Sequence, residues 1–273
     1  DLSGRLGRLA LIGLALLWSG FPILLVVISS FKQPRQIFEL PPSFVFTPTL
    51  QNYVRLWNVW PDFFSNMLNS LVITVGATIL TIVISSMAGY VYARHANRRL
   101  TGSAFFMIFV RMLPPIVITL PLFPVANRLG MHDTHLLLIL LYATFYVSLS
   151  TWIMRAFIAE LPRELEEAAF VDGATLAQTL IRIVLPLAAP GIIASAIFVL
   201  VFAWNEYIFA LIFTTRAAKT TPLVIAEMLG TVEGVEWGVL FAAATVQLLP
   251  LLVMVVALQR FVIAGLTAGA VKS

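Results

Sequence analysis

The segment ELEEAAFVDGATLAQTLIRIVLPLAAPG, residues 164–191, is unlike the sequence on either side of it. The chain as a whole is 60% hydrophobic and only 11% charged. Five of its 13 acidic residues nevertheless fall within 13 consecutive positions, namely Glu160, Glu164, Glu166, Glu167 and Asp172. A polar, acidic segment therefore separates two strongly apolar ones.

The residues of this segment predict a short helix, a turn and a second helix. Pro162 suits the first turn of a helix, where its missing N–H costs nothing, and Arg163–Val171 are good helix formers with carboxylates in the first turns. Asp172-Gly173 is a turn signal, and Ala174–Ile183 has apolar residues at helical spacing. Leu185-Pro186 is expected to end the second helix and to begin the next apolar span.

Composition places the chain in a membrane. Its mean hydropathy is +0.97, and its 60% apolar content exceeds the roughly 45–50% that is typical of soluble domains. No cysteine is present, which excludes disulfides, thiolate metal sites and cysteine nucleophiles. The net charge of +4 and the pI near 9.7 fit basic residues gathered at cytoplasmic loops and lipid headgroups better than a nucleic-acid partner.

Six apolar segments are long enough to cross the hydrocarbon layer, which needs roughly 20 residues. They predict an all-α membrane protein that forms one domain over residues 1–273. The third span carries Arg111 and the fifth carries Glu206. The predicted spans are Leu9–Phe31, Ser70–Tyr92, Phe105–Val125, Leu136–Ile153, Leu187–Phe213 and Val239–Leu258.

Basic residues predict the direction of the spans. With the N-terminus inside, the cytoplasmic segments hold ten Lys or Arg residues and the outer segments hold six. The positive-inside rule then favours both termini in the cytoplasm, together with the acidic loop, residues 155–186. Leu9–Phe31 is too long for the apolar core of a signal peptide and is followed by no A-x-A site, so it is expected to be a retained anchor.

Two spans have patterns that bear on packing. Span two has a small residue at every fourth position, which lets another helix approach closely, and span three has four prolines, which predict a kink or a break. A broken helix can line a path for a solute, but prolines are also common in ordinary membrane helices, and the sequence leaves both readings open. The residues are Ala77, Thr81, Ser85 and Gly89 in span two, and Pro114, Pro115, Pro121 and Pro124 in span three.

The order of residues in the acidic loop resembles a known signature. Glu167-Ala168-Ala169, Gly173 and Ile183-x-Leu185-Pro186 match the EAA pattern E-A-A-x3-G-x9-I-x-L-P, and Asp172 fits its common D-G-A form. The pattern is similar to that of the membrane subunits of binding-protein-dependent ABC importers. In that family the loop is a coupling helix in a cleft on the ATP-binding subunit. The resemblance implies the type I permease fold and a docking role for the carboxylates.

Softer motifs are similar to carbohydrate importers, and to the six-span second permease of maltose-type systems in particular. The resemblance implies a subunit of the bacterial inner membrane that forms half of the path for a sugar by alternating access. Its partners would be a second, homologous permease, two P-loop ATPase subunits that bind ATP and Mg²⁺, and an extracytoplasmic sugar-binding protein. The motifs are Ser30-Phe31-Lys32, Leu50-Gln51-Asn52-Tyr53, Asn69-Ser70, Ala203-Trp204-Asn205-Glu206 and residues 265–272.

The resemblance also implies roles for single residues of the loop. Glu167 would form an ion pair with a basic residue of the ATPase cleft, and the small Ala168 and Ala169 would let the helix seat closely. Gly173 would supply a turn with positive φ, and Leu185-Pro186 would fix the loop rigidly to span five. The chain contains no G-x4-G-K-[ST] motif, so ATP hydrolysis is expected in a separate subunit and this chain is not expected to be an enzyme.

Glu206 is the candidate for the solute path, because a carboxylate within a membrane span usually faces a bundle interior or a wet cavity. Trp204, Asn205 and Tyr207 accompany it, and aromatic faces suit sugar rings. Two alternatives stay open. One is a buried glutamate bonded to Asn205 or to a neighbouring helix. The other is a proton-coupled secondary transporter with Glu206 as proton relay and Arg111 as countercharge, which would not account for the acidic loop.

The sequence gives little support for a metal site or for an intramembrane enzyme. His132-Asp133-x-His135 could look like a metal site, but its place in a short outer loop indicates a solvated lip. The chain has no H-E-x-x-H motif, no G-x-S-x-G motif and no paired intramembrane aspartates, so an intramembrane enzyme is not indicated.

Overall fold

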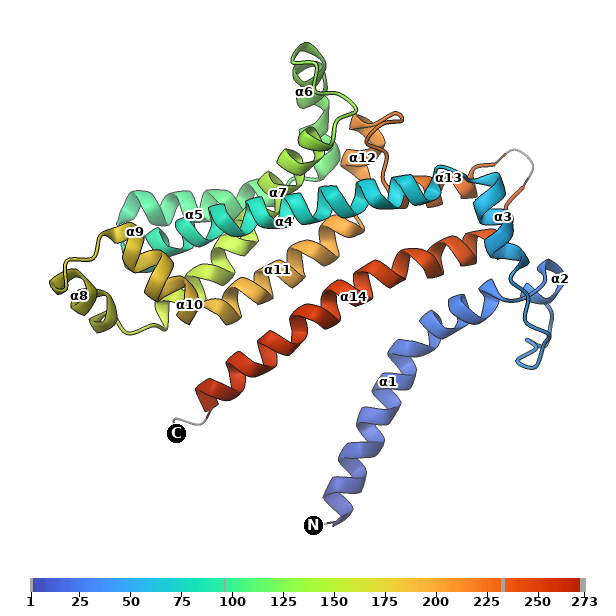
Figure 1. Cartoon of the computed structure of the whole chain (residues 1–273), viewed down its shortest axis with the longest axis horizontal. Coiled ribbons are helices and arrows are strands. Elements are labelled where there is room, and N and C mark those ends of the chain that lie inside the picture. Colours follow the sequence, from blue (N-terminus) through green and yellow to red (C-terminus); the bar gives the residue numbers. More distant parts are fainter. Residues whose placement is uncertain (1, 96, 232–233, 271–273) are drawn as a thin grey trace. The chain divides into compact units, whose positions relative to one another are not determined.

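The computed structural model describes residues 2–95, 97–231 and 234–270, and the side chains within 7–95, 97–231 and 234–259. Every regular element in these residues is a helix, which confirms the all-α prediction (Figure 1). Of the C-terminal stretch 265–272 that contributed to the resemblance, Val271 and Lys272 lie outside the described residues.

The helices follow one another along the chain, with a long connection, residues 38–50, between α2 and α3, and one segment, η1, is π-helical. In order they are α1 (Leu2–Ser30), α2 (Pro34–Ile37), α3 (Gln51–Val59), α4 (Phe63–Arg94), α5 (Arg98–Arg111), α6 (Pro115–Arg128), α7 (His135–Ala159), α8 (Glu164–Val171), α9 (Leu176–Thr179), η1 (Leu180–Val184), α10 (Leu185–Leu187), α11 (Ala189–Trp204), α12 (Ile208–Phe213), α13 (Thr221–Leu229) and α14 (Trp237–Ala270).

Four helices are long and apolar enough to cross a membrane: α1 over Gly7–Ser30, α4, α7, and α14 over Trp237–Gln259. Two further helix pairs meet the same criterion only when the two helices of a pair are counted together. Each of these pairs is bent at a short break. These pairs are α5 with α6, bent by 93°, and Leu176–Leu187 with α11, bent by 76°. Counted as one span each, the pairs bring the total to six, the number that the sequence predicts. The second pair differs in its bounds from the predicted fifth span, Leu187–Phe213, because it includes part of the acidic loop and ends at Trp204.

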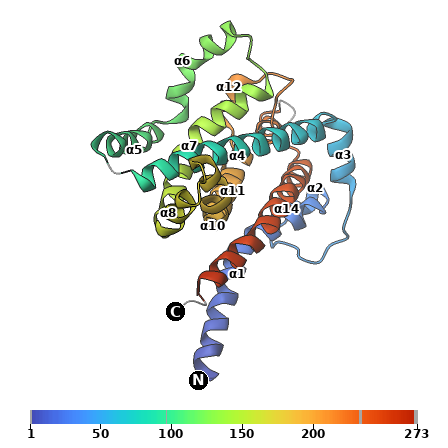
Figure 2. The same ribbon diagram turned by 60° about the vertical axis from the view of Figure 1, so that its left-hand side comes forward.

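The predicted break in the third span is confirmed, and prolines account for its position. Helix α5 ends at Arg111, and α6 begins at Pro115 after the extended residue Pro114. A proline disfavours helical backbone at the residue before it, so Pro114 and Pro115 together end one helix and start the next. Helix α6 consequently leaves the line of α5 (Figures 1 and 2).

The chain divides into two compact units. One unit combines Asp1–Ser65 with Val224–Leu249. Its core packs Leu56 of α3 and Phe63 against apolar residues of α13 and α14. The buried side-chain amide of Asn52 donates hydrogen bonds of 2.7 and 2.8 Å to the carbonyl oxygens of Ser30 and Lys32, which fixes α3 to the end of α1.

The other unit combines Asn66–Leu223 with Pro250–Ser273 and contains both the acidic loop and the predicted solute-path residues. Its main core lies between α4, α6, α7, α11 and α12. A second, smaller core lies beneath the acidic loop and joins the ends of α4 and α7 to the segment that leads into α11. The smaller core consists of Tyr90, Met154, Ile158, Val184 and Ala188.

The stripe of small residues in span two is a helix–helix contact, as predicted. Ala77, Thr81, Ser85 and Gly89 are all buried on α4. A Cβ atom added to Gly89 would lie 2.7 Å from the Cβ of Met154 in α7, closer than two carbon atoms can approach. Glycine at this position therefore sets the distance between the two helices.

Candidate coupling site

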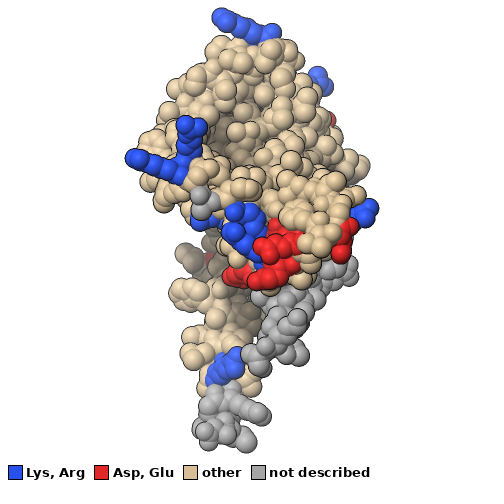
Figure 3. All heavy atoms as spheres, turned by 90° about the vertical axis from the view of Figure 1, so that its left-hand side faces the viewer, with Lys and Arg blue, Asp and Glu red and all other residues tan. Residues whose placement is uncertain are grey.

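The first helix of the acidic loop is α8, which starts at Glu164, two residues after Pro162, where the sequence predicts that it opens. Its first turn holds Glu164, Glu166 and Glu167, where the positive end of the helix dipole stabilises carboxylates. With α9 and α10 it lies at one end of α7 and α11 (Figure 1). Figure 3 views the molecule from this side and shows acidic side chains gathered there.

The two adjacent glutamates of α8 point to different surroundings. The Glu167 side chain is exposed, whereas Glu166 retains only 6% of its accessible surface. From the sequence, every carboxylate of this stretch is predicted to contact another protein. That prediction is wrong for Glu166, because its side chain is buried within this chain. The two alanines differ likewise, because Ala168 is exposed whereas Ala169 is buried within the chain.

Glu166 is held by the end of α4. Its Oε2 accepts a 2.7 Å hydrogen bond from the Tyr90 hydroxyl, and its Oε1 accepts one of 2.7 Å from Nε of Arg94. Nη2 of Arg94 lies 2.6 Å from the same Oε1, and it also donates to the carbonyl oxygen of Leu161 at 3.1 Å. The side chains of Arg94 and Glu166 are each only 8% exposed, so this is a buried, multiply bonded ion pair.

The turn after α8 requires glycine, as predicted. Gly173 has φ +83°, a region that penalises a side chain. Its N–H donates to the carbonyl of Phe170, and the N–H of Ala174 donates to the carbonyl of Ala169. These two bonds form a Schellman motif, which satisfies the carbonyls at the end of α8. A Cβ at Gly173 would contact nothing within 4 Å, so only the backbone conformation favours glycine.

The second helix differs from its prediction. Thr175 and Gln178 form a capping box at the start of α9, and the next residues form η1 rather than a continuous α-helix. Leu185-Pro186 does not end the helix, because Pro186 lies inside α10 and the chain bends only at Ala188. The proline ring would clash with the carbonyl four residues earlier in an α-helix, and the wider π turn just before it removes that clash.

Large apolar side chains on the loop are exposed although they lie outside the spans, and the sequence did not single them out. Val171 is 87% exposed, and Leu165 and Phe170 are 44% and 45% exposed. Exposed apolar groups beside a carboxylate are typical of a protein–protein contact. The signal available in the sequence is their position in a segment otherwise rich in charge.

The predicted solute-path residues lie at the break between α11 and α12. Trp204 and Glu206 are buried, Tyr207 is partly buried and Asn205 is exposed. The Glu206 carboxylate accepts the backbone N–H groups of Phe209 at 2.9 Å and Ala210 at 3.3 Å, so it caps the first turn of α12. The Asn205 amide instead donates to the carbonyl of Val201.

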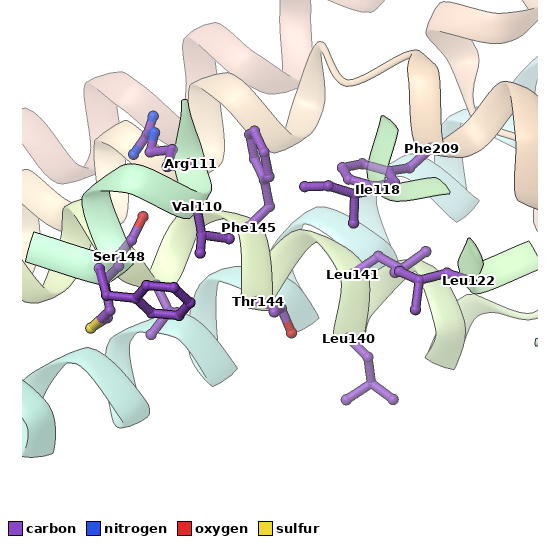
Figure 4. Close-up of a pocket in the computed structure, with 13 residues that line it drawn as sticks. Val110, Arg111, Ile118, Leu122, Leu140, Leu141, Thr144, Phe145, Ser148 and Phe209 are labelled. Atoms are coloured by element: carbon purple, nitrogen blue, oxygen red, sulfur yellow. The ribbon is translucent and has the colours of Figure 1, made fainter. Parts of the chain in front are cut away.

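Arg111 does not act as the countercharge of Glu206 in this structure. Its guanidinium lies over the rings of Phe145 and Phe198, at 5.9 and 5.3 Å, and the salt bridges of the described side chains do not include a pair with Glu206. Among the described residues, it is the only charged one that lines a cavity of about 470 Å³ between α5, α6 and α7 (Figure 4). The broken third span therefore borders an apolar cavity.

The His132-Asp133-x-His135 stretch is a partly exposed loop whose aspartate is bonded to the backbone of another loop. Across the described ranges no group of three or more His, Asp or Glu residues is arranged to hold a metal. The Asp133 carboxylate accepts four backbone N–H groups at 2.9–3.1 Å, from residues 215–218. Partial burial raises the pKa of the Asp133 carboxyl, but these N–H groups outweigh it and hold that pKa well below its usual range.

The N-terminal part of α4 is bonded to the same loop. The amide of Asn69 donates to the carbonyls of Ala217 and Lys219, both at 3.0 Å, and its Oδ1 lies 2.7 Å from Nε2 of His135. The hydroxyl of Ser70 accepts the N–H of Thr221 at 2.8 Å. Both ends of α4 are thus bonded to loops distant in the sequence.

Known proteins are similar in sequence to this chain. Residues 81–267 match the family described as binding-protein-dependent transport system inner membrane component. The trehalose transport system permease protein SugB of Mycobacterium tuberculosis is 38% identical over 269 residues, covering 96% of this chain and 94% of the relative. The trehalose/maltose transport system permease protein MalG of Thermococcus litoralis is 35% identical over 254 residues, covering 92% and 91%.

Solved structures share the fold. A bacterial ABC transporter involved in the import of the acidic polysaccharide alginate matches with a TM-score of 0.74 at 18% identity, covering 96% of this chain and 97% of that one. The MetNI methionine ABC transporter matches with a TM-score of 0.60 at 17% identity, covering 76% and 98%. The fold is that of an ABC importer permease.

The chain belongs to the family of inner membrane components of binding-protein-dependent transport systems. It is a multi-pass membrane protein and a permease subunit rather than an enzyme. Permeases of this family work together with an ATPase and a binding protein.

Proposed function

We propose that this permease forms half of the translocation path for a carbohydrate and that α8 couples it to a separate ATPase. The exposed Glu167 on α8, beside exposed apolar side chains, is the observation that carries the coupling role. The carbohydrate class is supported by relatives whose names include trehalose, maltose and, at 31% identity, diacetylchitobiose uptake. A second permease, two ATPase subunits with ATP and Mg²⁺, and an extracytoplasmic sugar-binding protein complete the proposed importer.

The exposed face of α8 is the proposed docking surface. Glu167 would pair with a basic residue of the ATPase, while Phe170 and Val171 would lose exposed apolar area on docking. Ala168 is small and exposed, which fits close seating, whereas Ala169 serves packing within this chain. Asp172 and Gly173 would end the docking helix sharply, and the docked loop and both termini would lie in the cytoplasm.

Ile183, Leu185 and Pro186 would carry the motion toward the spans. They lie in the segment that joins α9 to α11, and Leu185 packs against the smaller core beneath the loop. Because Val184 beside them is buried in that core, the segment is held against the ends of α4 and α7. A displaced α8 would therefore move α11 with it.

The four solute-path candidates would have two kinds of role. Asn205 and Tyr207 are accessible enough to contact a sugar, and a tyrosine ring can pack against its apolar face. Trp204 and Glu206 would hold the shape of the break from within, since both are buried. A proton-coupled carrier is less well supported, because Glu206 is engaged with backbone N–H groups and Arg111 lies over aromatic rings instead of beside it.

The test begins with copurification. The tagged chain, extracted gently from its native membrane, should bring with it a P-loop ATPase and a second multispan protein. Glu167→Lys should stay inserted but lose ATPase association by at least about tenfold, because breaking a desolvated ion pair costs about 2–5 kcal/mol. Glu164→Lys, exposed on the same helix, is the matched control and should associate normally.

Two results would contradict the proposal. Normal association and uptake in Glu167→Lys would remove the role assigned to α8. A chain that is purified alone, and whose uptake depends on a proton gradient, would favour the secondary carrier.

A further inference from the structure

We propose that Glu166 is a positioning residue that joins the coupling helix to α4, so that a displacement of α8 reaches α4 as well as α11. The inference rests on the proposed docking of α8 on an ATPase. It adds a second route between the loop and the spans, through side chains rather than along the chain. Neither the EAA pattern nor the similarity to known permeases assigns this role to Glu166.

The first observation is the density of bonds at one carboxylate. Each oxygen of Glu166 is bonded to α4, one to the Tyr90 hydroxyl and one to the Arg94 guanidinium. Tyr90 and Arg94 are four residues apart, so they lie on one face of α4 a turn apart. Two contacts one turn apart restrain both the position and the rotation of α8 relative to α4.

The second observation is that Arg94 also restrains the chain before α8. Its Nη2 donates to the carbonyl of Leu161, in the linker between α7 and α8. In return, Nη2 of Arg163 lies 3.4 Å from the carbonyl oxygen of Arg94. The end of α4 is therefore bonded both to α8 and to the linker that leads into it.

The third observation concerns the route along the chain. From α8 to α11 the backbone passes through the Gly173 turn, the π-helical η1 and a bend of 76°. Each of these is a place where the backbone departs from straight α-helix and can change direction. The side-chain route from Glu166 bypasses all three, so it transmits displacement directly to a continuous helix of 32 residues.

Glu166 and Glu167 form a natural matched pair. They are adjacent and identical in chemistry, yet one is buried against α4 and the other is exposed. If α8 docks through Glu167 and is tethered through Glu166, the two positions should fail in different ways. Loss of Glu167 should weaken ATPase binding, and loss of Glu166 should leave binding intact while separating ATP hydrolysis from transport.

The experiment compares Glu166→Gln and Arg94→Gln with Glu167→Lys in the complete complex, reconstituted in vesicles. Two quantities are measured for each variant: the amount of ATPase that copurifies, and the ratio of substrate transported to ATP hydrolysed. Glu166→Gln and Arg94→Gln should retain ATPase within about twofold and lower the ratio about tenfold, within the range of typical coupling free energies. Tyr90→Phe removes one bond and should lower the ratio about threefold.

A chemical rescue separates positioning from a general role in folding. The chain has no cysteine, so Arg94→Cys with Glu166→Cys introduces the only thiol pair of this chain. Joining the two thiols with a short bis-methanethiosulfonate reagent, which forms a disulfide with each thiol and releases methanesulfinate, should restore most of the transport ratio, and cleaving the disulfides with a reductant should abolish the restoration. Each single cysteine variant, treated with the same reagent, should stay at the low ratio.

The outcomes are distinguishable. If Glu166→Gln loses ATPase as Glu167→Lys does, Glu166 is a docking contact and the tether is refuted. An unchanged ratio in Glu166→Gln and Tyr90→Phe, or a joined thiol pair that restores nothing, refutes it as well. Failure of the proposed function itself would appear earlier, as absence of ATPase from the unsubstituted complex.

Discussion

The carboxylate of Glu206 accepts the backbone N–H of Phe209 at 2.9 Å, and this bond starts α12 inside an apolar environment. A helix that begins among buried residues has N–H groups that water cannot reach, and each unsatisfied group is costly. Glu206 satisfies two of them, at Phe209 and Ala210. A charged residue that looked like a transport site from the sequence therefore has a structural task.

Substitution of Glu206 should separate capping from proton transfer. Glu206→Gln keeps an oxygen that can accept one N–H, so it should retain most uptake and nearly normal thermal stability. Glu206→Ala leaves two buried N–H groups unpaired and should destabilise the protein by about 1–3 kcal/mol. Thermal unfolding in detergent measures the loss of stability, and uptake with and without a protonophore measures whether transport depends on a proton gradient. Complete loss of uptake in Glu206→Gln would instead indicate proton relay.

Substitution of Gly173 tests the turn. With φ at +83° and free space around the missing side chain, Gly173→Ala should cost about 1–2 kcal/mol through backbone strain alone. Gly173→Asn should cost less, because asparagine tolerates positive φ better than other side chains. The measurement is ATPase association, together with proteolysis of the loop. Equal effects of alanine and asparagine would argue against a conformational cause.

Substitution of alanine for two glycines of α4 should destabilise the protein to different extents. At Gly89 the new Cβ would meet the Cβ of Met154 at 2.7 Å and the backbone N of Arg155 at 3.0 Å, neither of which can move without α7. At Gly76 it would meet the terminal methyl of Ile139 at 2.8 Å. Gly89→Ala should therefore destabilise by about 1–3 kcal/mol and Gly76→Ala by less, as measured by thermal unfolding in detergent.

The same pair of glycines supplies its own control. Ile139→Val removes the methyl that obstructs Gly76→Ala, so the double variant should regain thermal stability. Ile139→Val should do nothing for Gly89→Ala, which lies against α7 at another level. Rescue of both would show that the loss reflects general loosening of α4 against α7.

The Asp133 cluster predicts a pH dependence with a definite sign. The pKa of Asp133 is lowered in the folded protein, so its contribution to stability is complete above the ordinary carboxyl pKa of about 4. That contribution is lost only as the pH falls through the lowered value. Hydrogen exchange of residues 215–218 should therefore be slow and show no stability change between about pH 5 and 8.

Asp133→Asn supplies the comparison for this cluster. The Asp133 carboxylate accepts the backbone N–H groups with both of its oxygens, whereas the amide of asparagine has only one oxygen that can accept them. Hydrogen exchange of residues 215–218 should therefore accelerate in this variant. Unchanged exchange in Asp133→Asn would mean that the loop is ordered without this carboxylate.

Much of this fold follows from local sequence. Apolar length located the spans, the prolines at 114 and 115 located the break, and the small stripe on α4 located a close helix contact. Gly173 was expected to adopt positive φ because an Asp-Gly pair ends a short helix. Each of these depends on residues close together in the chain, where steric rules suffice.

The features that sequence missed depend on distant partners. Glu166 and Arg94 are separated by 72 residues, and Asp133 is bonded to N–H groups 82 to 85 residues away. An eight-residue helix does not reveal which of two adjacent glutamates faces inward, so the sequence predicts a docking role for both. Pro186 was expected to end a helix because the π turn that accommodates it has no clear sequence signal.

The bonds at the two ends of α4 also constrain how long this helix can be. Asn69 and Ser70 near one end and Tyr90 and Arg94 at the other are spaced by a fixed number of residues, roughly 37 Å along the axis between Asn69 and Arg94 at 1.5 Å per residue. One inserted residue would rotate one set by about 100° and turn it away from its partners. Substitutions at the exposed positions of α4 leave this spacing unchanged, whereas an insertion or deletion within 70–90 requires both loops to change together.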